Sequence, residues 1–235
     1  MDTTTQGAAA SGAAFAPTRL TYETRGPAPA EAKGVIVVLH GVGGNPAKAW
    51  QLFEHAVPQG VMAVLCRGPF PWPQDPAGAG WFGVKFNDDG TREVKFDEEV
   101  ESRAALVELV EVVRADPRLK GKRIVLLGFH QGAIMSVNAL LQRPDLLDGV
   151  ALVTARVMAE VAQANPPQRA HRGLPVIWAH ADADYALPLP LAVAGRPILA
   201  DYGCDVTEYD YPGGAEVPPE TAARLRVWLE QLFNL

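Results

Sequence analysis

The 235-residue sequence predicts one α/β domain with a mostly parallel central sheet and helices on both faces. Three observations favour this class. Short β-branched runs alternate with longer helical patterns, as in strands joined by crossover helices. The strand candidates are apolar along their length, as strands buried on both faces are. The length also suits one domain, because such folds often exceed the average domain size without splitting.

Strands are expected at six apolar runs. The clearest covers residues 35–39, which are all aliphatic, as a strand buried on both faces should be. The other five runs cover residues 61–65, 124–127, 150–153, 176–178 and 206–211.

Helices are expected between these runs. Residues 97–115 repeat apolar side chains at close to a 3.6-residue period, with acidic residues on the other face. The pattern ends at Asp116 and Pro117, as a helix should. Two further helices are expected at residues 131–143 and 218–233.

The composition narrows the possible partners. A net charge of −6 argues against binding to nucleic acid or an anionic membrane, because phosphate-binding surfaces need an excess of Lys and Arg. No apolar run approaches the roughly 20 residues that span a bilayer. Cys66 and Cys204 lie in apolar, strand-like stretches and are expected to be buried free thiols. Two distant cysteines supply too few ligands for a metal.

The N-terminal residues 1–18 are rich in Ala, Thr, Ser and Gly. Asp2 stands where a secretory signal has basic residues, and the Ala run lacks an apolar core, so no signal peptide is expected. The sequence instead predicts a flexible tail on a cytoplasmic protein, followed by a single domain over residues 19–235.

One segment, residues 69–95, interrupts the alternation of strands and helices. Long loops are often binding loops or covers, so this insertion is expected to lie over the functional site. Its residues 87–90, Asn-Asp-Asp-Gly, are consistent with a hairpin turn. Trp72, Trp81 and Phe82 either line a substrate pocket or only pack the loop against the domain, and both interpretations stay open.

Two glycine-rich motifs follow predicted strands. His-Gly-Val-Gly-Gly at residues 40–44 lets the backbone turn tightly, so that an N–H can point at a substrate oxyanion. Gly-Phe-His-Gln-Gly at residues 128–132 lies between a strand and a helix, and its small residues permit the strained turn that exposes the side chain at position 130. The N–H of Gln131 lies at a helix N-terminus, which favours negative charge.

Two polar loops complete the pattern. His-Ala-Asp-Ala-Asp at residues 180–184 follows the strand at 176–178, and Tyr-Pro-Gly-Gly-Ala-Glu at residues 211–216 follows the last strand. The pattern resembles that of α/β-hydrolases, in which loops at these places deliver an acid and a histidine to a nucleophile in the chain order nucleophile, acid, histidine.

These motifs resemble those of the phospholipase/carboxylesterase family, small α/β-hydrolase esterases related to acyl-protein thioesterases and dienelactone hydrolase. The likeness runs from about Leu39 to the C-terminus. It implies the α/β-hydrolase fold and a small-molecule ester as substrate. It also implies an oxyanion hole made by the backbone N–H groups of Val42 and Gln131, and the family acid at Asp184 rather than Asp182.

Two residues depart from the family pattern. His130 stands in the place of the nucleophilic serine, and Ala215 stands in the place of the catalytic histidine. An ordinary Ser-His-Asp mechanism is therefore excluded, because alanine supplies no base. The surrounding glycines and Asp184 are retained, and the two changes are reciprocal, since one imidazole is kept but moved. This favours a selected or engineered exchange over drift.

Four interpretations of the altered site stay open. In the first, the protein is an inactive relative. In the second, the His130 ring swings into the space vacated at Ala215, pairs with Asp184 and acts as nucleophile or general base. In the third, His130, His180 and Asp184 bind a metal ion, although the oxyanion pocket is not shaped for one. In the fourth, the pocket binds an ester or acid without turnover.

The second interpretation is the prediction taken forward: an ester hydrolase without cofactor or metal, monomeric or homodimeric. The residues expected around the substrate are Trp72, Trp81, Phe82 and Ala215. Arg156 faces the same end of the sheet by topology, and either binds a substrate carboxylate or pairs with a nearby acid. His40 is expected to be structural, and His55 and His171 to face solvent.

Overall fold

The computed structural model describes residues 15–86 and 92–235. The strands are β1 (Tyr22–Arg25), β2 (Gly34–Leu39), β3 (Met62–Cys66), β4 (Phe70–Trp72), β5 (Asp75–Gly80), β6 (Val84–Phe86), β7 (Arg92–Val94), β8 (Arg123–Phe129), β9 (Gly149–Val153), β10 (Pro175–Ala181) and β11 (Asp205–Tyr211). The helices are α1 (Pro46–Phe53), α2 (Phe96–Ala115), α3 (Gln131–Gln142), α4 (Ala159–Ala164), α5 (Leu189–Asp201) and α6 (Pro219–Phe233). Short 3-10 turns cover Pro117–Leu119, Pro144–Leu146 and Arg169–His171.

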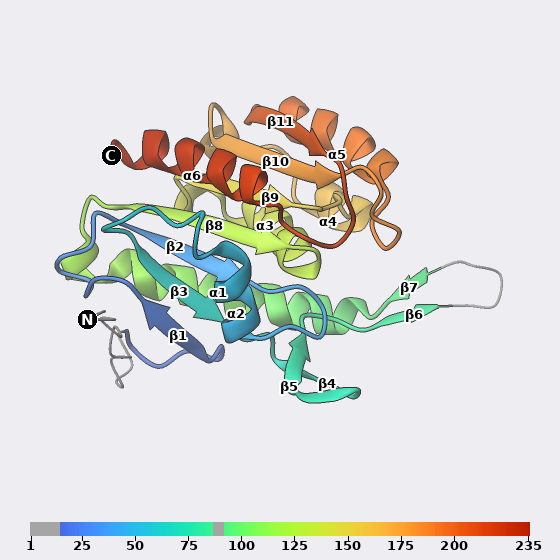
Figure 1. Cartoon of the computed structure of the whole chain (residues 1–235), viewed down its shortest axis with the longest axis horizontal. Coiled ribbons are helices and arrows are strands. Elements are labelled where there is room, and N and C mark those ends of the chain that lie inside the picture. The colour runs from blue at the N-terminus through green and yellow to red at the C-terminus, as the bar shows by residue number, and fades with distance from the viewer. Residues whose placement is uncertain (1–14, 87–91) are drawn as a thin grey trace, which may run out of the picture.

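A seven-stranded sheet in the order β1-β3-β2-β8-β9-β10-β11 forms the centre of the molecule (Figure 1). The edge strand β1 runs antiparallel to β3, and the other neighbouring strands are parallel. All six predicted strands belong to this sheet, so the mostly parallel α/β architecture is confirmed. Within the described residues, no helix is both long and apolar enough to cross a membrane.

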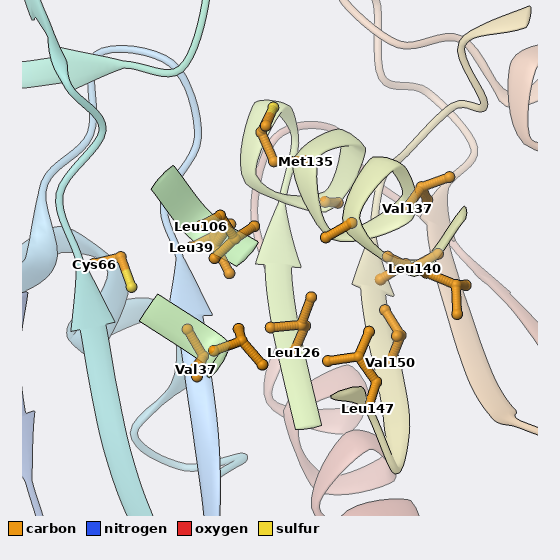
Figure 2. Close-up of a cluster of buried hydrophobic side chains, with 14 of the residues drawn as sticks. Val37, Leu39, Cys66, Leu106, Leu126, Met135, Val137, Leu140, Leu147 and Val150 are labelled. Atoms are coloured by element: carbon orange, nitrogen blue, oxygen red, sulfur yellow. The ribbon is translucent and has the colours of Figure 1, made fainter. Parts of the chain in front are cut away.

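Helices cover both faces because successive residues of a strand point to opposite sides. Val35, Val37 and Leu39 of β2 belong to a core cluster shared with α2, α3, α4 and α5. Ile36 and Val38 belong to a second cluster, shared with α1 and α6. Figure 2 shows part of the first cluster, where side chains of β2, β8 and β9 pack against α3. Every residue of β2 is buried, which explains why this run contains no polar residue.

The predicted helices α2, α3 and α6 are present, whereas α1, α4 and α5 were not predicted. The start of α1 carries an ordinary capping signal. The Asn45 side chain accepts a hydrogen bond from the N–H of Lys48 at 2.9 Å, and Pro46 occupies the first turn, where its missing N–H is harmless. The Asn-Pro pair in the sequence was therefore a usable sign of this helix.

The N-terminal boundary differs from the prediction. Residues 1–14 of the predicted tail lie outside the described residues. Phe15, also assigned to the tail, is buried in the core, and its N–H donates to the Tyr22 hydroxyl at 3.0 Å. The packed domain therefore begins before residue 19. Both cysteines are buried free thiols, as predicted, and burial raises the pKa of Cys204 to about 11.

The described residues of the segment 69–95 form two antiparallel strand pairs rather than one irregular loop. β4 pairs with β5, and β6 pairs with β7. The predicted turn at residues 87–90 lies outside the described residues, but the strands on either side of it pair. A bridge between Gly44 and Ala79 ties β5 to the glycine-rich loop after β2. The insertion is thereby fixed beside the carboxyl ends of the parallel strands.

Candidate active site

The elbow at position 130 joins β8 to α3. His130 has φ 48° and ψ −116°, a conformation that is unfavourable for residues other than glycine. Two glycines permit it. A Cβ on Gly128 would overlap the backbone of Gly132, and a Cβ on Gly132 would overlap the carbonyl oxygen of Leu39. The glycine spacing is thus required by the close approach of α3 to the ends of β2 and β8.

Replacing Gly132 by alanine is expected to lower the free energy of unfolding by about 2–3 kcal/mol, because the backbone around the new methyl group cannot yield without moving α3. Urea denaturation measures this change. The matched control is Gly214→Ala, whose new Cβ would meet its nearest atom, on Glu216, at an ordinary 3.5 Å. The control is expected to change stability by less than about 0.5 kcal/mol. Equal stability of the two variants would contradict this account of the elbow.

His130 forms a close pair with Asp184. Its Nε2 lies 2.7 Å from Asp184 Oδ2, and the side chains are 12% and 1% exposed, respectively. The ring also stacks on Phe129, with centroids 4.2 Å apart. In the neutral ring, Nε2–H donates to the carboxylate, and the lone pair is left on Nδ1.

Electrostatics favour the neutral form of this ring. Burial lowers the pKa of His130, and the nearby Asp184 carboxylate opposes that effect only in part, so the pKa stays below its ordinary value. The neutral ring therefore predominates at neutral pH. A neutral imidazole with a free lone pair has the form that a nucleophile or a general base requires.

The loop after β10 holds Asp184 in place. Oδ1 accepts hydrogen bonds from the N–H groups of Ala186 and Leu187, both at 2.8 Å. His180 donates from Nε2 to the Leu187 oxygen at 2.8 Å and so fixes the same loop. Burial by itself raises the pKa of Asp184, but hydrogen bonds from Leu187, His130 and Ala186 outweigh it and lower the pKa overall. Asp184 is therefore an oriented carboxylate.

A metal site at His130, His180 and Asp184 finds no support in this geometry. The Nδ1 of His180 accepts from the Trp178 indole at 3.4 Å, and its Nε2 is used by Leu187. Both oxygens of Asp184 also have protein partners. In the part of the chain that the structure describes, His, Cys, Asp and Glu form no group of three or more suited to a metal ion.

The glycine-rich loop after β2 is held at both sides of Val42. The N–H of Gly43 donates to the Ala79 oxygen at 2.9 Å, and the N–H of Gly44 donates to the Gly41 oxygen at 3.0 Å. Val42 itself lines the same pocket as His130 and is 43% exposed. This arrangement is compatible with the predicted oxyanion donor, which stays a prediction.

Gln131 contributes through its side chain as well as its place at the start of α3. Its Oε1 accepts the N–H of Trp81 at 3.1 Å, and its Nε2 donates to the Phe82 oxygen at 2.7 Å. These bonds tie the segment after β5 to the elbow. The backbone N–H of Gln131 lies in the first turn, where the helix dipole favours an anion.

Trp81 does not line the substrate pocket, contrary to the prediction. Its side chain is fully buried, and the indole N–H donates to the His40 oxygen at 2.8 Å. His40 is structural, as predicted: Nδ1 donates to the Gly41 oxygen at 2.7 Å, Nε2 accepts the N–H of Gly68 at 3.0 Å, and burial lowers its pKa to about 4. Trp81 and His40 therefore stabilise the loops around the site through their hydrogen bonds.

A pocket of about 290 Å³ opens in front of His130. Trp72 and Phe82 line it, as predicted, although their contact with a substrate stays a prediction. Sequence reasoning missed most of its other apolar residues, because these come from four separate parts of the chain. The apolar side chains of the wall include Trp72, Phe82, Val84, Ile134, Leu187 and Leu191.

The prediction that Ala215 lies around the substrate is also wrong. It is exposed, in the loop between β11 and α6, and is not part of the pocket wall. The loop is nevertheless bound to the acid loop: the N–H of Ala183 donates to the Gly213 oxygen at 2.9 Å, and the N–H of Gly213 donates to Asp182 Oδ1 at 3.1 Å. Position 215 is thus two residues from a segment fixed beside Asp184.

Of the two histidines predicted to face solvent, only one does. The side chain of His55 is 86% exposed. His171 is fully buried, where its Nε2 contacts the Leu140 oxygen at 3.1 Å and its Nδ1 accepts the N–H of Gln168 at 2.8 Å. These contacts connect a surface loop to α3. His171 does not line the pocket in front of His130.

Comparisons with known sequences point to one family. The sequence model of a family described as phospholipase/carboxylesterase matches residues 26–229. Esterase YpfH of Escherichia coli is 28% identical over 181 residues, which cover 75% of this chain and 72% of that protein. Acyl-protein thioesterase 1 of Neurospora crassa is 28% identical over 141 residues, 57% of each chain.

Solved structures agree with the fold. The crystal structure of esterase PE8 matches with a TM-score of 0.76 and 21% identity, over 91% of this chain and 99% of that one. The Arabidopsis thaliana SOBER1 structure matches with a TM-score of 0.70 and 17% identity, over 85% and 98%. At these identities, the similarity establishes the α/β-hydrolase architecture alone.

Proposed function

Because the chain belongs to the phospholipase/carboxylesterase family of α/β-hydrolases, we propose that it hydrolyses small carboxylic esters with His130 as nucleophile or general base. The observation that carries this proposal is the 2.7 Å contact between His130 Nε2 and Asp184 Oδ2 at the wall of an apolar pocket. The pair keeps one imidazole and one carboxylate of the family's usual triad. In this chain the elbow residue itself, His130, carries the imidazole.

In the nucleophilic form, Nδ1 of neutral His130 attacks the ester carbonyl carbon. The carbonyl oxygen becomes an oxyanion, which the backbone N–H groups of Val42 and Gln131 stabilise. The C–O bond to the alcohol then breaks, the departing alkoxide takes a proton from water, and the proton on Nε2 passes to the Asp184 carboxylate that it faces. Water hydrolyses the resulting acyl-imidazole, releases the acid and restores the ring.

In the general-base form, the same nitrogen acts on water. Nδ1 of His130 removes a proton from a water molecule as its oxygen attacks the carbonyl carbon, and the imidazolium then protonates the leaving alkoxide. Asp184 stabilises the transient positive charge on the ring. The oxyanion is held by the same two N–H groups as in the nucleophilic form.

Both forms predict a rate that falls in acid. Hydrolysis of p-nitrophenyl acetate is expected to be fastest at and above neutral pH and to decline as pH drops, because protonation of Nδ1 removes the lone pair. Since burial lowers the pKa of His130, and Asp184 only partly offsets this, the midpoint of the decline in kcat/KM is expected below pH 6.5, the ordinary imidazole value.

The control for this pH profile is His55→Gln, which removes an exposed histidine outside the pocket and is expected to leave the profile unchanged. Circular dichroism at each pH separates loss of catalysis from unfolding. A rate that stays constant or rises through the acid range, in folded protein, would contradict a catalytic role for the neutral ring. A folded protein that hydrolyses no ester at any pH would instead favour the inactive or ligand-binding interpretation.

A further inference from the structure

The pocket carries a permanent positive charge in an otherwise uncharged wall. Arg156 lines it together with His130, and none of the described lining residues is acidic. A guanidinium presents five N–H donors in a planar fork, so it can bind a carboxylate beside any protein partner. An apolar pocket that contains such a group is suited to a ligand with one anionic end.

The position of Arg156 is fixed by the strand that precedes it. β9 lies between β8, which carries the elbow, and β10, which leads to Asp184. The N–H of His130 donates to the Val153 oxygen at 3.1 Å, so the end of β9 contacts the elbow directly. Thr154 then turns the chain at φ 53°, with its N–H bound to the Ala179 oxygen at 2.8 Å.

The residues after Arg156 are held as well. Met158 is buried, and its sulfur lies 3.2 Å from the Asn138 side-chain nitrogen on α3. The backbone of Arg156 is therefore bracketed by Thr154 and Met158, both packed in the core. Because this backbone is already fixed, binding a ligand at the guanidinium orders the side chain but not the loop, which limits the entropic cost.

We infer that the pocket selects esters whose acyl chain carries a second, ionised carboxyl group, and that Arg156 binds this carboxylate. The inference rests on the proposed function and specifies its substrate class. The acyl chain is the part bound through both steps of hydrolysis, whereas the alcohol departs. A cavity of about 290 Å³ lies at the lower end for ligand pockets, which favours a short half-ester of a dicarboxylic acid.

The test separates binding from turnover by using the His130→Ala variant. Calorimetry compares its affinity for monomethyl glutarate with that for methyl 5-amino-5-oxopentanoate, the neutral amide of the same shape. The carboxylate is expected to bind about 10- to 100-fold more tightly, as hydrogen bonds to a charged group predict. Adding Arg156→Gln is expected to abolish this preference and leave amide binding unchanged, and Arg156→Lys to retain part of it.

The control is Arg169→Gln, which removes the same charge from an exposed position outside the pocket and is expected to keep the preference. Equal affinity for the two probes, or an equal loss of both on Arg156→Gln, would overturn the inference. If Arg156→Gln does not fold, as judged by circular dichroism, Arg156→Met, which keeps an unbranched apolar side chain without the charge, decides: a preference identical to that of Arg156 protein overturns the inference, and a lost one supports it.

Turnover by the otherwise unchanged protein distinguishes the two proposals. If it hydrolyses the p-nitrophenyl esters of glutarate and of its half-amide with equal kcat/KM, the carboxylate inference fails and the catalytic proposal stands. If the His130→Ala protein prefers the carboxylate probe but the unchanged protein hydrolyses neither ester, the catalytic proposal fails and carboxylate binding by Arg156 stands.

Discussion

Replacing His130 by alanine is expected to lower kcat/KM for p-nitrophenyl acetate by about 10²- to 10⁴-fold, the usual contribution of a positioned acid–base group. The reason is that His130 carries the imidazole of the pocket wall and the lone pair that Asp184 orients. Rapid-mixing kinetics and mass spectrometry of the quenched protein measure the effect. A burst of nitrophenol and a transient acetyl adduct on His130 identify the nucleophilic form. A His130-dependent rate without an adduct identifies the general-base form.

The matched control for this loss is His55→Ala, because it removes an exposed imidazole outside the pocket. It is expected to keep the full rate. Asp184→Asn, which keeps the shape but not the charge of the partner, is expected to lower kcat more than to raise KM, since the tautomer and the charge of the ring are affected rather than binding. Unchanged hydrolysis by a folded His130→Ala protein would show that another group performs the reaction.

The combined change His130→Ser and Ala215→His is expected to create a serine hydrolase that fluorophosphonate probes label. Asp184 is already oriented by Ala186 and Leu187, and the loop that carries Ala215 is bound to Ala183 through Gly213. A histidine at position 215 is therefore expected to reach the carboxylate, and a serine at the elbow takes the place that the family gives its nucleophile. Gel fluorescence after probe labelling, together with aryl ester hydrolysis, measures the gain.

The single changes are the controls for this gain. His130→Ser alone has no base, and Ala215→His alone has no serine, so neither is expected to be labelled. Adding Asp184→Asn to the double variant is expected to reduce labelling, because the new histidine loses its partner. A folded double variant that remains unlabelled would mean that the pocket has diverged at positions beyond these two.

Several features of the site depended on contacts that no local pattern reveals. Trp81 was predicted to line the pocket because it lies in an aromatic insertion. Its indole N–H instead donates a hydrogen bond to the oxygen of His40, which is distant in the sequence. His171 lies in a polar, Pro-rich stretch but fastens that stretch to α3 from a buried position. Ala215 follows a glycine turn whose direction is set by bonds to Asp182 and Ala183. For Trp81 and His171 the surrounding composition therefore suggested the wrong environment, and for Ala215 its position in the family motif did.

The sequence by itself determined the parallel sheet and the elbow. Strands buried on both faces must be apolar throughout. Helix α3 can approach β2 only if positions 128 and 132 carry no side chain. Both features can therefore be recognised from short stretches of the sequence. Only the tertiary structure decided which side chains reach the pocket. The pairing of His130 with Asp184, 54 positions away, was predicted only through the family resemblance, and the apolar wall formed by Val84, Ile134, Leu187 and Leu191 was not predicted at all. Such contacts depend on how neighbouring strands end at one edge of the sheet, which spacing along the chain does not encode.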